Sequence, residues 1–119
     1  MWTYKGKRKA EFYKRVNIDG KDKLLHVNGW LCEFDNGHRS ISLFIDSSAC
    51  SFTCGLTGMN AFEPFGYPPS KRTISRTIDL FINSAYPDAY CKYVLDSKHY
   101  EREIAEYRKM MRKMGVSNG

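Results

Sequence analysis

The sequence predicts an α+β fold, with a three-stranded antiparallel meander over about residues 10–46 and two or three helices packed on one of its faces. Two turn dipeptides, Asp19-Gly20 and Asn36-Gly37, separate three stretches in which apolar residues alternate with polar ones. This pattern is typical of half-buried strands joined by hairpin turns. Residues 97–114 instead repeat their apolar residues at helical spacing. Because the helical stretches follow the strands, we expect the helices to cover one face of the sheet.

The 119 residues are expected to form one domain, 1–119, since a chain of this length can bury roughly two thirds of its unfolded surface. Residues 1–9, MWTYKGKRK, show neither the alternation of a strand nor the apolar spacing of a helix, and they are interpreted as a flexible basic arm. Residues 46–69 contain three glycines and three prolines, and they are interpreted as a long irregular connection. The aromatic residues of this connection indicate that part of it packs, through a short helix or a fourth strand near residues 51–56.

The predicted meander contains one internal conflict. The first turn places Leu25 and Val27 on the apolar side of the second strand. The second turn, if it has two residues, places Trp30 and Cys32 there. These two pairs lie on opposite faces of a regular strand, so we expect a β-bulge at residues 28–29 that brings all four side chains to one side.

A long C-terminal helix is predicted over residues 97–114. Ser97 suits its N-cap, Gly115 suits a left-handed stop after its last turn, and its acidic residues precede its basic ones, which complements the helix dipole. Its apolar stripe comprises Tyr100, Ile104, Tyr107, Met111 and Met114. The same spacing is found in coiled coils, so we expect a monomer or a weak dimer, with packing inside the chain preferred.

Two shorter helices are predicted before it. The first begins at Ser70 and ends before Pro87, because a proline disfavours helical geometry in the preceding residue. Its apolar stripe comprises Ile74, Ile78, Phe81, Ile82 and Ala85. The second is a short helix over residues 88–95.

The charge of the chain is positive and unevenly distributed. Nineteen Lys and Arg against thirteen Asp and Glu give a formal net charge of +6. Residues 1–23 carry eight of the cations against three acids, whereas residues 24–69 carry one cation against four acids. A basic protein of this kind has an affinity for polyanions.

The predicted partner is therefore nucleic acid or a nucleoprotein complex, and the predicted function is that of a small non-catalytic binding module. Cations that track a phosphate backbone and flat rings that stack on bases are the two components of such a surface. The candidate binding residues fall into an N-terminal, a central and a C-terminal cluster: Trp2, Tyr4, Lys5, Lys7, Arg8 and Lys9; Lys71, Arg72 and Arg76; Arg108, Lys109, Arg112 and Lys113.

The alternative is a protein-binding inhibitor or adaptor of a larger nucleic-acid-processing enzyme, of the kind that phages and mobile elements encode. Phe62, Phe65 and Tyr67 lie in a proline-rich stretch, and aromatic side chains held in such loops are typical anchors of protein interfaces. If instead they cover one end of the core, they are expected to be buried.

No catalytic residues, metal site or cofactor are expected. Cys50, Cys54, Cys91 and His99 are residue types that bind zinc, but only the first two are close in sequence, and structural zinc sites usually take two close pairs. All four cysteines are interpreted as free thiols of a cytoplasmic protein, because the chain shows no secretion signal. A membrane partner is not expected, since no apolar stretch approaches the roughly 20 residues of a membrane span.

Overall fold

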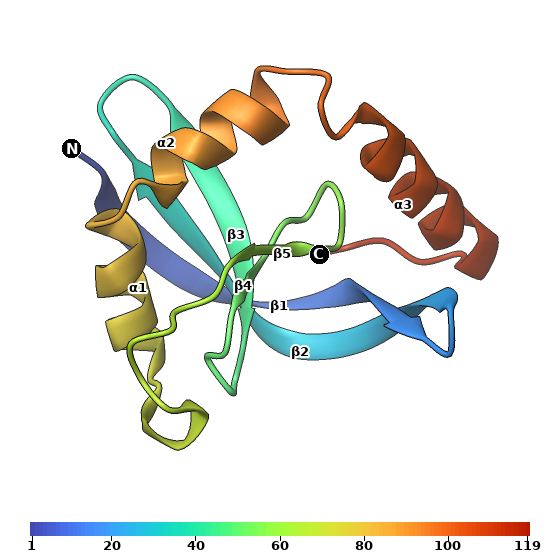
Figure 1. The fold of residues 1–119 in the computed structure, drawn as a ribbon, viewed down its shortest axis with the longest axis horizontal. Coiled ribbons are helices and arrows are strands. Elements are labelled where there is room, and N and C mark those ends of the chain that lie inside the picture. The colour runs from blue at the N-terminus through green and yellow to red at the C-terminus, as the bar shows by residue number, and fades with distance from the viewer.

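The computed structural model describes residues 1–119 and has an α+β fold, which confirms the predicted fold class (Figure 1). Five antiparallel strands form one sheet in the order β1-β2-β3-β4-β5, two more than the predicted meander. The strands are β1 Thr3–Ile18, β2 Lys21–Asp35, β3 Ser40–Asp46, β4 Phe52–Thr53 and β5 Asn60–Phe62. The helices are α1 Ile74–Ile82, α2 Tyr86–Tyr90 and α3 Glu101–Met114. A 3-10 turn, Pro69–Lys71, precedes α1, and a π-helical turn, Cys91–Leu95, continues α2.

The long hairpin of β1 and β2 is built on the predicted two-residue turn. Ile18 pairs with Lys21, and both residues between them have positive φ angles, 52° for Asp19 and 79° for Gly20. These angles define a turn whose twist matches that of the two strands, and an Asp-Gly pair is among the sequences that adopt it most readily.

The bulge expected at residues 28–29 is wrong, because the ladder is regular there and pairs Gly29 with Ala10. The connection at residues 36–39 has four residues and pairs Cys32 with Leu43. The two apolar pairs of β2 do lie on opposite faces, and no bulge is needed because β2 packs apolar side chains on both faces. Gly29 is nevertheless required, since a Cβ atom at this position would collide with the carbonyl oxygen of Ile45. Close approach of two backbones therefore explains this glycine.

The interpretation of residues 1–9 as an arm is also wrong. Thr3–Lys9 belongs to β1, and the ladder has its bulge here, between Tyr4 and Gly6. Trp2 is only 6% exposed, and its indole Nε1 donates a hydrogen bond to Asp88 Oδ1 at 2.9 Å. The sequence does not show this strand, because its cations, Lys7 and Lys9 on one face and Arg8 on the other, leave no apolar alternation.

The sheet has a core on each face. The larger core lies between the sheet and the helices α1 and α2, where the rings of Phe34, Phe52 and Phe62 surround Phe81 of α1 at centroid distances of 4.9–5.3 Å. On the opposite face the ring of Phe12 stacks on that of Phe44, with centroids 4.8 Å apart.

The outer edge of β1 is closed over only part of its length. Arg15 N donates to Gly58 O at 2.8 Å, Tyr13 N donates to the Asn118 side chain at 2.9 Å, and Glu11 exchanges two backbone hydrogen bonds with Gly119. The β4–β5 loop therefore reaches β1, which requires a strongly curved sheet. Residues 3–9 of the same edge make no such contacts.

Two helix starts differ from prediction. Thr73 caps α1 by accepting a hydrogen bond from Arg76 N, so the helix begins later than Ser70. The C-terminal helix begins at Glu101, because the Ser97 hydroxyl bonds within the preceding turn, donating to Tyr93 O. Its expected stop at Gly115 is confirmed by a φ angle of 67°.

The predicted stripe of α3 is buried only in part. Tyr107 and Met111 are buried, whereas Met114 is exposed. Within residues 46–69, expected to be largely irregular, β4 confirms the fourth strand that was one alternative near residues 51–56, and β5 was not expected. No helix of the structure is long and apolar enough to span a membrane.

Candidate nucleic-acid interface

The predicted binding residues Lys7 and Lys9 lie on one face of β1, beside Trp30 of β2. Lys9 is the cross-strand partner of Trp30, and Lys7 is the partner of Cys32. The Nζ atom of Lys7 lies 4.9 Å from the centroid of the indole ring, and that of Lys9 lies 6.0 Å from it. Alternation along the strand explains why both lysines reach the same ring, since residues two apart point to the same face. We call Lys7, Lys9 and Trp30 the lysine–tryptophan platform.

A shallow hollow of about 410 Å³ adjoins the platform. It lies over Ala10 and Gly29, two small residues that face each other across β1 and β2. Its polar and aromatic lining comprises Lys9, Glu11, Asn28, Trp30 and Ser47, together with Gly119. The side chains of Asn28 and Ser47 are exposed and make no hydrogen bond within the protein.

The basic half of β1 carries charge that the protein does not neutralise. Lys5, Lys7, Arg8 and Lys9 are all exposed, and none of them takes part in an ion pair. Arg8 points to the opposite face from Lys7 and Lys9, because it alternates with them along the strand. The platform thus contains two unneutralised cations, Lys7 and Lys9, and two more, Lys5 and Arg8, lie nearby on the same strand.

Other residues of the predicted N-terminal cluster serve the core. Trp2 is buried and its indole N–H is occupied by Asp88. Tyr4 is half-buried, with its ring centroid 5.9 Å from that of Phe34. Burial raises the pKa of the Tyr4 hydroxyl. The Trp2 ring is therefore closed to a base, and the Tyr4 ring packs partly against the core.

The predicted central cluster is reduced to one free cation. The Arg72 side chain is only 8% exposed, and it donates to the carbonyl oxygens of Tyr67 at 2.8 Å and Cys50 at 3.3 Å. Arg76 lies over the Tyr67 ring at 5.2 Å and donates to Lys71 O. Both arginines therefore fix the connection before α1, and Lys71 alone remains free.

The predicted C-terminal cluster forms a separate patch. Its residues Arg108, Lys109, Arg112 and Lys113 are exposed on α3 and make no ion pairs. Figure 1, drawn with the longest axis horizontal, places α1 and α3 at opposite ends of the molecule, which measures 38 Å along this axis. The three predicted clusters therefore do not form one continuous surface.

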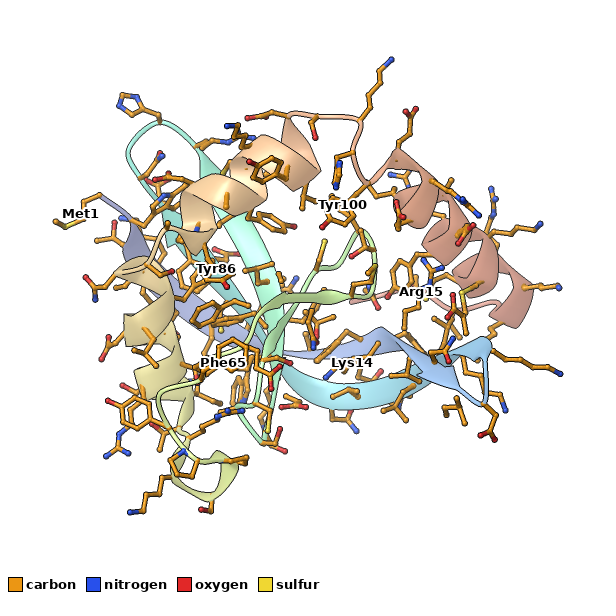
Figure 2. The ribbon with its side chains drawn as sticks, in the orientation of Figure 1. Met1, Lys14, Arg15, Phe65, Tyr86 and Tyr100 are labelled. Atoms are coloured by element: carbon orange, nitrogen blue, oxygen red, sulfur yellow. The ribbon has the colours of Figure 1, made fainter.

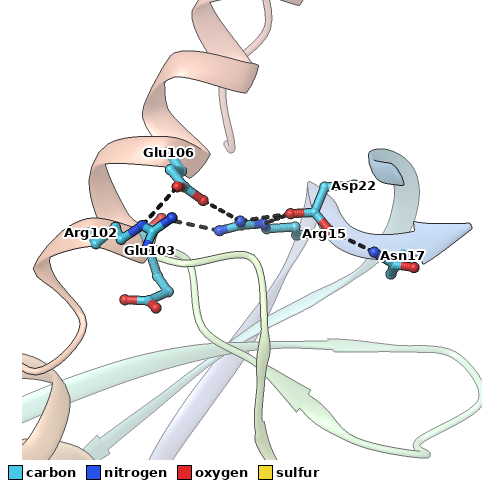
Figure 3. A network of polar contacts seen from close by, with 6 residues as sticks. All are labelled: Arg15, Asn17, Asp22, Arg102, Glu103 and Glu106. Atoms are coloured by element: carbon cyan, nitrogen blue, oxygen red, sulfur yellow. Dashed lines mark hydrogen bonds and ion pairs between the residues drawn. The ribbon is translucent and has the colours of Figure 1, made fainter. Parts of the chain in front are cut away.

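Arg15 connects the distal half of the hairpin to α3 (Figure 3). Its guanidinium donates to Asp22 Oδ2 at 2.7 Å and 3.0 Å and to Glu106 Oε2 at 2.6 Å. The Arg15 hydrogen bonds hold the pKa values of both carboxyl groups below their usual range. This bridge places α3 against the part of β1 that lies beyond the hollow.

The predicted protein-interface residues differ in exposure. Phe62 is buried in the core, Tyr67 is half-buried under Arg76, and Phe65 is 85% exposed. Figure 2 shows Phe65 in the connection between β5 and α1, with Tyr86 at the start of α2. Tyr86 is also exposed, so these two rings are open to a partner.

The cysteines are free thiols, and no group of three or more His, Cys, Asp or Glu side chains has a geometry that could hold a metal ion. Burial raises the pKa of the Cys32 thiol to about 11. Cys54 Sγ lies 3.3 Å from the hydroxyl of Tyr90 in the core. Cys50, Cys54, Cys91 and His99 are thus not brought together.

Sequence reasoning assigned Trp30 only to the sheet and missed its position in the site. The two-residue turn at Asp19-Gly20 was the signal that could have found it, because its register, continued along β1, places Lys9 opposite Trp30. Comparisons with protein-family models, curated proteins and solved structures found no match to this chain.

Proposed function

We propose that the protein is a small binding module that holds nucleic acid, free or within a nucleoprotein complex, on the basic half of β1. The lysine–tryptophan platform carries this proposal, because it combines unneutralised cations with an aromatic ring. Phosphate groups are attracted by such cations, and bases stack on such rings. The absence of an ion pair at Lys5, Lys7, Arg8 and Lys9 means that no internal ion pair has to be broken when phosphate binds.

The test is the affinity of a Lys7→Gln/Lys9→Gln variant for a labelled mixed-sequence oligonucleotide, followed by fluorescence anisotropy over a series of salt concentrations. Binding by the native protein is expected to weaken steeply with salt. In the variant the affinity falls, and the salt slope decreases by roughly one unit for each lost phosphate contact.

The matched control is Lys21→Gln/Lys23→Gln. It removes the same charge from the same two-stranded hairpin, but near its turn and away from Trp30. This control is expected to keep most of the affinity. Equal losses in both variants would show a general charge effect and would contradict a site on β1.

A protein partner is the second candidate function, and the 85% exposure of Phe65 favours it. Exposed aromatic side chains such as those of Phe65 and Tyr86 are typical anchors of a protein interface. If a larger enzyme is the target, a Phe65→Ser variant should lose the partner that the native protein retains in a pull-down. Retention by the variant would contradict this candidate.

A further inference from the structure

We propose that the nucleic acid bound at the platform is single-stranded, with one unpaired base in the hollow against Trp30 and the flanking phosphates on Lys7 and Lys9. This inference rests on the proposed function and adds the class of ligand. It follows from the position of the hollow, the groups that line it and the direction of the charge across it.

The position of the hollow allows stacking and phosphate binding together. Trp30 belongs both to the lining of the hollow and to the platform under the two lysine ammonium groups. Lys9 also belongs to both. A base entering the hollow would meet the indole, and the ammonium groups, which are held by long flexible side chains, would remain free to contact its phosphates.

The other groups of the hollow suit the edge of a base. Asn28 supplies an amide that donates and accepts, and Ser47 supplies a hydroxyl, both without partners inside the protein. Glu11 supplies an acceptor, and its Oε1 lies 3.7 Å from Nε2 of His26. Asn and Glu side chains are among those that bind amino groups and ring nitrogens of bases.

The charged groups around the hollow favour the base of a nucleotide on one side of the site and its phosphate on the other. Glu11 repels a phosphate group from the hollow, whereas Lys7 and Lys9 attract it to the neighbouring side. A ligand that carries its charge on the backbone and a neutral ring beside it matches this polarity.

A duplex does not match it. The faces of its bases are stacked on one another, so the indole ring has no base face to contact unless the duplex is opened. Single strands present these faces without that cost, and aromatic side chains in basic grooves are the usual means of binding them. The structure therefore favours an unpaired strand.

The experiment compares one mixed-sequence oligonucleotide as a single strand and as a duplex, with the full-length native protein at two salt concentrations. The native protein should bind the single strand more tightly. The Asn28→Ala/Ser47→Ala variant, which removes two exposed side chains without internal bonds, should lose about 2- to 10-fold in single-strand affinity. Its salt slope should not change, because no phosphate contact is removed.

A Trp30→Leu variant provides the second readout. It should abolish the preference for the single strand while leaving the salt-dependent binding of the duplex, and circular dichroism checks that it folds. Equal affinity for both forms, unchanged in both variants, would overturn the single-strand inference and leave the proposed function standing. No binding to either form at low salt would overturn both.

Discussion

Arg15 is the residue through which the two-stranded hairpin and α3 are held together. Its side chain is 11% exposed and contacts carboxylates from both sides, Asp22 of β2 and Glu106 of α3. It also donates to the backbone oxygen of Glu103 at 3.4 Å. A guanidinium shared by two carboxylates stabilises all three charges only when the hairpin and the helix are in place.

This bridge predicts a loss of stability in acid. The pKa values of Asp22 and Glu106 are lowered in the folded protein, chiefly by hydrogen bonds from Arg15. Their contribution is therefore complete above the unfolded values of about 4 and is lost as the pH falls through the lowered folded values. Urea unfolding at a series of pH values should show a steeper decline below about pH 5 in the native protein than in Arg15→Gln.

The control for this prediction is Arg102→Gln. Arg102 is exposed and contacts Glu106 one helical turn away, at 3.2 Å, but it does not reach the hairpin. This variant should retain most of the native pH dependence. An Arg15→Gln variant with the same acid profile as the native protein would contradict the role of the bridge.

Single residues also show which of the predicted binding residues the structure leaves accessible and which it uses internally. Lys7 and Lys9 were predicted as binding residues, and the structure leaves them exposed and unpaired. Trp2 and Arg72 were predicted on the same basis, yet one fills the core and the other binds backbone oxygens. Composition shows that a cation or a ring is present, but its partners come from segments distant in sequence.

At the scale of elements, the β4–β5 loop is where α3 meets the sheet. Gly58 has a φ angle of 70°, and its Cα faces the ring of Tyr107 so closely that an added Cβ would collide with it. The Tyr107 hydroxyl donates to Tyr13 O at 2.5 Å and accepts from Asn118 Nδ2 at 3.0 Å. Loop, helix, strand and C-terminal tail thus meet at one tyrosine.

Gly58→Ala is therefore expected to destabilise the protein by about 3 kcal/mol, from a left-handed backbone and a collision with the ring. Gly37→Ala is the matched comparison, because Gly37 has a φ angle of 89° but nothing within 4 Å of the added Cβ. It should cost only about 1 kcal/mol. Urea denaturation measures the free energy of unfolding of both variants. Equal losses would show that the Tyr107 ring does not exclude a side chain at position 58.

Elements were predictable where local signals agree. The first hairpin turn has an Asp-Gly pair and alternating flanks, and the C-terminal helix has a stripe, ordered charges and a glycine stop. The first part of β1 and the short strand β5 were missed, and β4 was expected only as one of two alternatives near residues 51–56. Their pairing depends on neighbours across the sheet, and strands of two and three residues are too short to show a period.

At the scale of the whole molecule, the covering elements leave one part of β1 open. The helices α1 and α2 cover the sheet at one end and α3 at the other, as Figure 1 shows. The C-terminal tail and the β4–β5 loop bond to the outer edge of β1 at Glu11, Tyr13 and Arg15. Residues 5–9 remain uncovered, and they carry the cations of the proposed site.

The overall positive charge and the fold class could be predicted from the sequence, whereas the arrangement of the charge could not. The predicted clusters on α1 and α3 lie at opposite ends of the molecule, and two arginines before and within α1 are used for internal contacts. What joins Lys7 and Lys9 to Trp30 is the register of two strands, which the two-residue turn at Asp19-Gly20 sets, together with the extension of β1 through residues 3–9.

The most direct test of the proposed site is a titration of the ¹⁵N-labelled protein with a short single-stranded oligonucleotide, followed by two-dimensional NMR. Its two tryptophans give separate indole signals, and the Trp2 indole, bonded to Asp88, is an internal control. If the proposed site is correct, the signals of the Trp30 indole and of the amides of Lys7, Lys9 and Asn28 should shift, while the Trp2 indole signal should not. Shifts centred on α3 or around Phe65, with Trp30 unchanged, would contradict it.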